Sequence, residues 1–386
     1  MASMTPDPPP SPPAPDPSER ELLDRYLGPD PPGEMSRRTA RLRRALRGET
    51  RRRATRYWGA LGALAVVVLG TVAYGVVQHQ RVERAGAAAA DLFYAAKALE
   101  LEVGRLRLTA EERQAYRERQ ADLAKRYRDY LEDLGIYGDG TPARTRLIYE
   151  VVHRFGETEV GVPKEFFRDV ERRIAAWRNT GRLDSSVARA RAAAYGPKAA
   201  AILLEHDLAP DFFYLAFQES EFKVEAVGPR TRFGIAKGMW QMIPGTARDY
   251  GLHTGPLVGV PRADPLDERH DFAKSTEAAA RYLRDIYTTD AQASGLLVIA
   301  SYNWGQTRML RLIRSMPPSP KDRNYWTLLA RYRDRIPLET YDYVINVVAA
   351  AAVGLNPSLF GFRFSPPLPE TDALVGAQVR ERAAGP

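Results

Sequence analysis

Apolar residues recur at helical spacing along most of the chain, and the places where this pattern breaks divide it into segments. Residues 1–57 are crowded with proline and arginine and hold too few apolar side chains to order themselves, which predicts a disordered tail. Residues 58–77 are twenty residues without a charge. At about 1.5 Å per residue, a helix of this length crosses the roughly 30 Å hydrocarbon core of a bilayer. We therefore predict one transmembrane helix over 58–77.

A buried helix of a soluble domain and a cleaved signal peptide are the alternatives to this membrane helix. An arginine cluster directly precedes the segment and Trp58 lies at its edge, which is typical of a membrane boundary. A signal peptide has a shorter leader and a shorter apolar run than this chain shows. Arginines before the segment outnumber those after it, so the positive-inside rule places the N-terminus in the cytoplasm and the residues after 78 outside.

Residues 78–141 carry two apolar seams of the kind that packs against a partner helix. The first seam advances by alternating steps of four and three residues and consists of Leu92, Ala96, Leu99, Val103 and Leu106. Thr109 and Glu112 match a capping box that opens a second helix. The seam of that helix consists of Tyr116, Leu123, Tyr127, Tyr130 and Leu134, before glycine and proline in 135–142 end it. We predict a helical stalk or hairpin here, and self-association of the stalk is a further expectation.

The pattern from 142 to 357 is helical throughout and predicts an all-α fold, because no run of alternating strand residues is convincing. We divide this part into a helical N-terminal portion, 142–208, and a domain that carries the chemistry, 209–357. The segments expected to face the core are 175–177, 199–204, 278–286, 296–302 and 343–353. Residues 358–386 contain several prolines and are predicted to be a loosely attached tail.

Composition and charge narrow the function. The formal charge of +8 resembles a nucleic-acid signal, but ten arginines against one acid, Glu49, lie in residues 37–56. Because the excess lies beside the predicted membrane helix, we expect no nucleic-acid partner. The absence of cysteine excludes disulfides, thiolate zinc sites and a cysteine nucleophile. The five histidines are scattered without metal-ligand spacing, so neither a metal nor another cofactor is expected.

Glu219 lies on the apolar side of a predicted helix over 210–222. At about 100° per residue, the residues within about 60° of Glu219 are Phe212, Leu215, Ala216 and Phe222. The opposite, polar side consists of Asp211, Tyr214, Gln218 and Glu221. Burial and the negative end of the helix dipole both favour the protonated form of a carboxyl group. Such an acid suits general-acid cleavage of a glycosidic bond; the alternative is a buried structural glutamate paired with an arginine.

Glu219, Ser220 and Phe222, followed by Ala226, resemble the first motif of the lytic transglycosylases that cut bacterial peptidoglycan, relatives of goose-type lysozyme. Four more blocks follow in that family's order. They are Gly-Met-Trp-Gln-Met-Ile-Pro-Gly-Thr-Ala at 238–247, Asp264-Pro265 before an alanine-rich helix at 278–283, Ser-Tyr-Asn-Trp-Gly at 301–305, and Glu-Thr-Tyr-Asp-Tyr-Val at 339–344. The resemblance extends more faintly back to about Val162, and the first 140 residues are not covered.

The resemblance implies a lysozyme-like helical domain and cleavage of the β-1,4 bond between MurNAc and GlcNAc with a 1,6-anhydro-MurNAc product. Glu219 would act first as general acid and then as base, without an obvious second carboxylate beside it. The groove residues that the resemblance implies are Gln241, Tyr302, Asn303, Glu339, Tyr343, Ser220 and Met242. The substrate would be peptidoglycan, and the location the bacterial inner membrane, with one pass, a cytoplasmic N-terminus and a periplasmic catalytic domain.

The chain departs from the family's pattern at two places. About four extra residues, 229–233, precede the Trp-Gln block, and Ser301 and Trp304 stand where alanines are usual. We expect Trp240 to be a packing residue rather than a substrate contact. Hydrolysis by a lysozyme-like muramidase and a non-catalytic wall-binding scaffold are the alternative functions.

Overall fold

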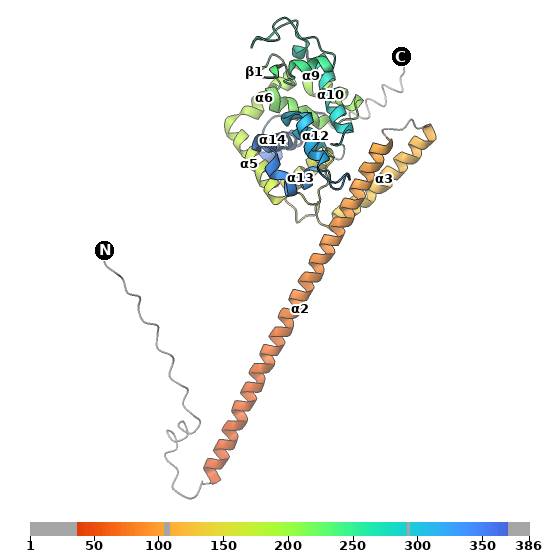
Figure 1. The fold of residues 1–386 in the computed structure, drawn as a ribbon. Helices are drawn as coiled ribbons and strands as arrows, with labels where there is room; N and C mark the ends of the chain where they lie inside the picture. The colour runs from red at the N-terminus through yellow and green to blue at the C-terminus, as the bar shows by residue number, and fades with distance from the viewer. Residues whose placement is uncertain (1–36, 104–108, 292–293, 370–386) are drawn as a thin grey trace, which may run out of the picture. The chain divides into compact units, whose positions relative to one another are not determined.

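The computed structural model describes residues 37–103, 109–291 and 294–369 (Figure 1). The chain divides into two compact units, Met1–His79 and Gln80–Pro386. Helix α2 (Arg37–Val103) contributes to both. The predicted tail over 1–57 is therefore wrong for its arginine-rich end, where residues 37–57 are helical. Arginine, alanine and leucine are good helix formers, and a helix already nucleated by the apolar segment extends at little cost.

The first unit contains the segment predicted to cross a membrane. The large apolar side chains described there lie open to the surroundings, with Trp58 70%, Val66 70% and Leu69 68% exposed. The helix from Trp58 to Leu101 is long and apolar enough to span a bilayer. Such a continuous apolar surface is unfavourable in water and is covered when it lies in lipid.

In the second unit, α3 (Ala110–Asp133) opens with the predicted capping box. The Thr109 hydroxyl accepts a hydrogen bond from the Glu112 amide, and the Glu112 carboxylate accepts one from the Thr109 amide. The predicted seams are only partly buried, since Tyr127 is buried while Leu92 and Leu123 are half-buried. The buried residues of α2 in this unit are instead Ala89, Phe93 and Tyr94. The side chain of Val103, and Leu106, lie outside the described residues.

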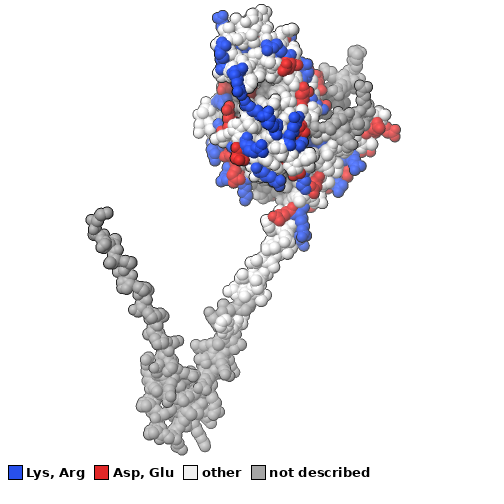
Figure 2. Space-filling view, viewed as in Figure 1, with Lys and Arg blue, Asp and Glu red and all other residues white. Residues whose placement is uncertain are grey.

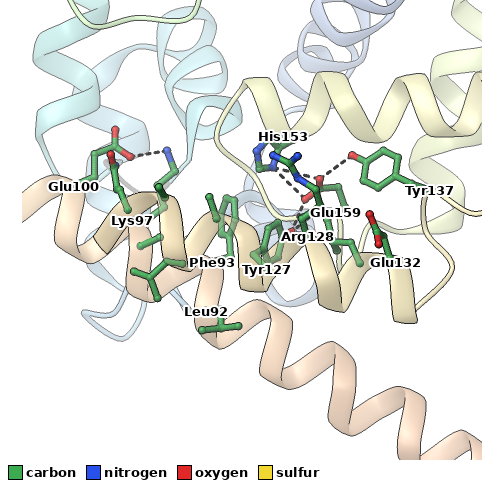
Figure 3. A pocket seen from close by; sticks show the side chains of 16 residues that line it. Leu92, Phe93, Lys97, Glu100, Tyr127, Arg128, Glu132, Tyr137, His153 and Glu159 are labelled. Atoms are coloured by element: carbon green, nitrogen blue, oxygen red, sulfur yellow. Dashed lines mark hydrogen bonds and ion pairs between the residues drawn. The ribbon is translucent and has the colours of Figure 1, made fainter. Parts of the chain in front are cut away.

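The buried face of α2 packs on α3 and on the loop after α4 (Ala143–Arg154), as Figure 3 shows. The rings of Phe93 and Tyr127 are 5.3 Å apart between centroids. Tyr127 and Tyr137 both donate hydrogen bonds from their hydroxyls to the buried Glu159 carboxylate. At the other end of the same cavity, the Lys97 ammonium donates to the Tyr287 hydroxyl at 3.0 Å. These contacts attach the predicted stalk to the globular part, and a cavity of about 650 Å³ remains between α2 and α3.

The globular part is helical, and α14 (Leu338–Leu355) forms its centre. Helices α4, α5, α8 and α11 pack against α14, whose residues 343–354 are all buried. This helix is also apolar enough to span a membrane, but 78% of it is buried inside the protein, so it is a core helix. The other α-helices are α5 (Lys164–Thr180), α6 (Arg182–Ala192), α7 (Tyr195–Glu205), α8 (Tyr214–Ser220), α9 (Pro244–Asp249), α10 (Phe272–Thr288), α11 (Gly295–Trp304), α12 (Gln306–Arg314) and α13 (Tyr325–Tyr332).

The prediction that 142–357 contains no strands is wrong in one place. Strands β1 (Val227–Thr231) and β2 (Gly234–Lys237) form an antiparallel hairpin, so the extra residues 229–233 build its first strand and turn. Strands this short, with glycine and proline among their residues, carry no alternating apolar pattern. Tertiary contacts decide their structure.

The prediction of a loose tail over 358–386 is also wrong for its first part. Phe360 and Phe362 are buried against the main core, and the Arg144 side chain donates a hydrogen bond to the Leu359 carbonyl at 3.1 Å. The prolines suggested a loose segment, but the two phenylalanines hold it on the core, because burying an aromatic side chain removes a large apolar area from water. Residues 370–386 lie outside the described residues.

Gly354 sets the distance between α14 and α8. A Cβ atom built at this position would lie 1.7 Å from the Tyr214 hydroxyl oxygen, on the first residue of α8. Gly354→Ala should therefore push these helices apart and lower the free energy of unfolding by about 1–3 kcal/mol. Thermal unfolding of the full chain in detergent measures this change. Gly245→Ala is the matched control, because nothing lies within 4 Å of its added Cβ; equal melting temperatures of the two variants would contradict this role of Gly354.

Candidate active site

Glu219 is the second-last residue of α8, at the helix end where the backbone dipole is negative. The helix is shorter than the predicted 210–222. A 3₁₀ turn, η1 (Pro210–Phe213), precedes it, and Glu221 ends it in the left-handed region with φ 55°. The expectation of a polar side is partly wrong, since Asp211 and Tyr214 are buried. Most of the segment lies inside the core, and Asp211 is compensated there by the Arg154 guanidinium 3.7 Å away.

The Glu219 carboxyl lies half-buried between α8 and α14. Burial raises its pKa to about 7, the hydrogen bond from Tyr343 opposes this shift, and the negative charge of Glu339 adds to it. The Tyr343 hydroxyl donates that bond to Oε1 of Glu219 at 2.5 Å. A pKa in this range keeps the protonated and the charged form of the carboxyl group both accessible near neutral pH.

Glu339 and Tyr343 lie four residues apart on α14, so both side chains lie on the same face of the helix. Glu339 is exposed in the first turn, whereas Tyr343 is buried. The sequence pattern predicted no second carboxylate beside Glu219. This expectation is wrong, because the Glu339 carboxylate lies close enough for its charge to act on Glu219. Glu221, by contrast, forms ion pairs with Arg182 and Lys223, both at 2.9 Å, and its pKa is lowered by these partners.

Tyr302 and Asn303 come from the end of α11, and Tyr302 lies close enough to the acid for the charge of Glu219 to act on it. The Tyr302 hydroxyl donates a hydrogen bond to the Trp240 carbonyl at 2.6 Å, and the Asn303 side-chain oxygen accepts one from the Thr340 hydroxyl at 2.8 Å. Burial first, and the charge of Glu219 second, raise the pKa of Tyr302 well above its usual range. Tyr302 is therefore a neutral hydroxyl that braces α11 against the loop around Trp240.

The loop at 238–242 carries three residues that the sequence pattern singled out, Trp240, Gln241 and Met242. Gln241 adopts a left-handed conformation with φ 46°, and its side-chain amide donates to the Gly238 carbonyl at 2.7 Å. Trp240 is fully buried and donates to Thr276, which confirms it as a packing residue. Met242 is 3% exposed.

Ser220 and Met242 need correction as substrate contacts, because both face the interior. The Ser220 hydroxyl is buried and donates to the Met239 carbonyl at 2.7 Å. Their position follows from the turn after α8, which directs Ser220 toward the 238–242 loop. The bond from Ser220 to Met239 holds this loop against the end of α8.

A buried ion cluster that the sequence analysis missed supports the same loop. The Arg269 guanidinium pairs with the Asp267 carboxylate at 2.7 Å and donates to the carbonyls of Ile235 and Met242. Lys237, also buried, lies 3.8 Å from Asp267. Arg269 follows the Asp264-Pro265 block by four residues, but an arginine in a loop has no distinguishing pattern in a single sequence. The cluster joins the hairpin to the loop that carries Gln241.

A cavity of about 520 Å³ lies near this site, although none of the residues expected in the groove lines it. Tyr282 of α10 links the two, because its ring lines the cavity and lies 5.4 Å from the Tyr302 ring. Burial chiefly raises the pKa of Tyr282 to about 12, and the charge of Glu219 contributes to this shift. The full lining is Phe233, Ile243, Thr246, Asp249, Tyr250, Tyr282, Asp285, Trp304, Gly305, Gln306, Thr307 and Arg308. Within the described ranges, no group of three His, Cys, Asp or Glu side chains is arranged to hold a metal ion.

Comparison with known proteins agrees with this geometry. Residues 204–324 match the family described as Transglycosylase SLT domain. The chain carries a transglycosylase SLT domain. The match includes Glu219, Gln241, Tyr302 and Asn303, whereas Glu339 and Tyr343 lie beyond its end. The structure brings these two residues of α14 to the acid of the SLT domain.

Two curated relatives are similar to part of this chain. Both are described as membrane-bound lytic murein transglycosylase D, one from Escherichia coli strain K12 and one from Escherichia coli O6:H1. Each is 28% identical over 216 residues, which are 56% of this chain and 42% of the relative. The chain thus aligns with less than half the length of these relatives.

The raised pKa of Glu219 predicts how stability depends on pH. An unfolded glutamate loses its proton near pH 4.5, so between that value and about 7 the folded chain binds more protons than the unfolded chain. Stability therefore falls as pH rises through this range. Glu219→Gln removes this pH-dependent loss. As pH rises from 5 to 8, the free energy of unfolding of the variant should therefore increase by about 1–3 kcal/mol relative to that of the wild type. Unfolding of the full chain in detergent at both pH values measures the gain.

Glu221→Gln is the control, because the pKa of Glu221 is lowered rather than raised. Its ion pairs contribute stability above the unfolded pKa, so this variant should lose stability at neutral pH. Parallel pH profiles for the two variants would contradict the assignment of Glu219 as the buried acid.

Proposed function

We propose that the protein is a membrane-anchored peptidoglycan lytic transglycosylase that cleaves the β-1,4 bond between MurNAc and GlcNAc. One observation carries this proposal: Glu219, inside the SLT domain, is a carboxyl group whose burial raises its pKa to about 7. A general acid is most effective when its pKa lies near the working pH. Glu219 meets that requirement, and its charge acts on Tyr282, which lines a cavity large enough for a ligand.

The chemistry starts with proton transfer from the Glu219 carboxyl to the glycosidic oxygen, which leaves with GlcNAc as the bond breaks. The positive charge that develops on MurNAc is met by the substrate's own N-acetyl group, and the Glu219 carboxylate then takes the proton of the 6-hydroxyl. That oxygen closes the 1,6-anhydro ring, so no water is consumed and the acid regains its proton. The Tyr343 hydroxyl, 2.5 Å from Oε1, stabilises the carboxylate between the two transfers.

Hydrolysis is the second candidate, because Glu339 is an exposed carboxylate close enough to affect the pKa of Glu219. A second carboxylate that activates water is the arrangement of inverting glycosidases. The two outcomes differ by one water in the mass of the product. Glu221 is not the second carboxylate in either reaction, since its carboxylate forms ion pairs with Arg182 and Lys223.

We place the catalytic domain outside the cytoplasm at the bacterial inner membrane. The exposed apolar run of α2 supports one membrane span, and the relatives carry "membrane-bound" in their names. The arginine excess before the span supports a cytoplasmic N-terminus. Figure 2 shows both signs of charge on the visible face of the globular part rather than a continuous basic surface, in keeping with a glycan substrate. Self-association of the stalk remains a prediction.

Incubation of purified cell wall with the full chain in detergent tests the proposal. The wild type should release 1,6-anhydro-muropeptides, and Glu219→Gln should reduce the release at least about 100-fold. Gly245→Ala serves as a purification-matched control. Products heavier by one water would establish hydrolysis instead, and undiminished release by the Glu219→Gln protein would refute the assigned acid.

A further inference from the structure

Two aromatic walls of the 520 Å³ cavity come from positions where the chain departs from the lytic transglycosylase pattern. Phe233 belongs to the extra residues before the Trp-Gln block, and Trp304 stands where an alanine is usual. These departures lie 71 residues apart in sequence, at 233 and 304, yet line one cavity, which the Tyr282 ring connects to the ring of Tyr302. Each therefore adds aromatic surface at the same place.

The hairpin holds Phe233 at this cavity. Gly234, with φ 97°, packs so closely on Pro244 that an added Cβ would lie 2.9 Å from the proline ring. The Thr231 hydroxyl closes the turn by donating to the Gly234 carbonyl and accepting from the Phe233 amide. The Arg232 guanidinium lies 4.7 Å from the centroid of the Phe233 ring. Phe233 is nevertheless 56% exposed, so a large part of its ring is available to a ligand.

Trp304 is the last residue of α11, two residues after Tyr302, and is half-buried at the cavity. Polar groups that have no hydrogen-bond or ion-pair partner within the described part of the chain lie around it. They are the Trp304 indole N–H, the Arg308 guanidinium and the Asp249 carboxylate. The cavity thus combines aromatic surface with free donors and one free acceptor.

This combination suits a carbohydrate. A pyranose ring has an apolar face of C–H groups and an edge of hydroxyl or acetamide groups, and aromatic side chains with a few placed polar groups are the usual lining of ligand sites. The volume of about 520 Å³ lies within the range of such sites. A single acidic or basic ligand would leave either Arg308 or Asp249 facing a like charge, whereas a neutral sugar can bond to both.

We propose that Phe233 and Trp304 form a glycan-binding subsite, particular to this chain, that holds N-acetylated sugar residues next to the bond that Glu219 cleaves. This inference rests on the proposed function. The aromatic pair determines how tightly a strand is held at this end of the site, and Glu219 performs the bond cleavage.

Binding without turnover tests the subsite. Full-length Glu219→Gln protein in detergent is titrated with chitotetraose, a neutral strand of four GlcNAc residues, by calorimetry. Adding Phe233→Ala or Trp304→Ala should weaken binding about tenfold each, because each removes one stacking surface. Trp304→Phe, which keeps an aromatic ring, should recover most of the affinity and controls for misfolding of the alanine variant.

Leu266→Ala is the matched surface control, since Leu266 is 70% exposed and does not line the cavity; its affinity should equal that of the parent. Unchanged affinity in both the Phe233→Ala and Trp304→Ala proteins, or no binding of chitotetraose by the parent, would overturn the subsite. The proposed lytic activity fails by a different result, the absence of anhydro products from the wild type. The two claims can therefore be refuted separately.

Discussion

The hydrogen bond between Tyr343 and Glu219 crosses the contact between α14 and α8, and the candidate site depends on it. The two residues are 124 positions apart in sequence, so only the packing of the core helix brings them together. Burial favours the neutral acid, while Tyr343 favours the carboxylate. A pKa near 7 is the balance of these two effects, with the charge of Glu339 on the side of the acid. A small change in the distance between α8 and α14 alters both the burial of Glu219 and its hydrogen bond with Tyr343.

The rest of the domain fixes this distance. Because Gly354 has no side chain, the Tyr214 hydroxyl can pack directly against α14. The Arg269–Asp267 pair connects the hairpin to the 238–242 loop. Tyr302 bonds to the same loop from α11. Buried polar contacts therefore hold both the acid and the 238–242 loop. Such a frame suits a group that must give up and regain a proton in one geometry.

Helical periodicity was sufficient to predict the helical fold and the partial burial of Glu219, and the uncharged run at 58–77 predicted a helix that is apolar enough to span a bilayer. It failed where contacts distant in sequence decide the structure. Asp211 and Tyr214 are buried because α8 lies inside the core, and no pattern within a single helix reveals that a neighbour such as Arg154 compensates them. Strands of four and five residues carry no pattern of their own. The family resemblance placed Tyr343 in the groove but did not predict its hydrogen bond to Glu219, since spacing alone relates no two residues so far apart.

Titration of the Glu219 carboxyl tests the central claim most directly. Infrared difference spectra of the full chain between pH 4 and pH 9, with Glu219→Gln subtracted, isolate the protonated carbonyl band of this one group. We predict a midpoint near pH 7, and a higher midpoint in the Tyr343→Phe protein, which lacks the bond that stabilises the carboxylate. A midpoint close to 4.5, the ordinary value for glutamate, would contradict the account.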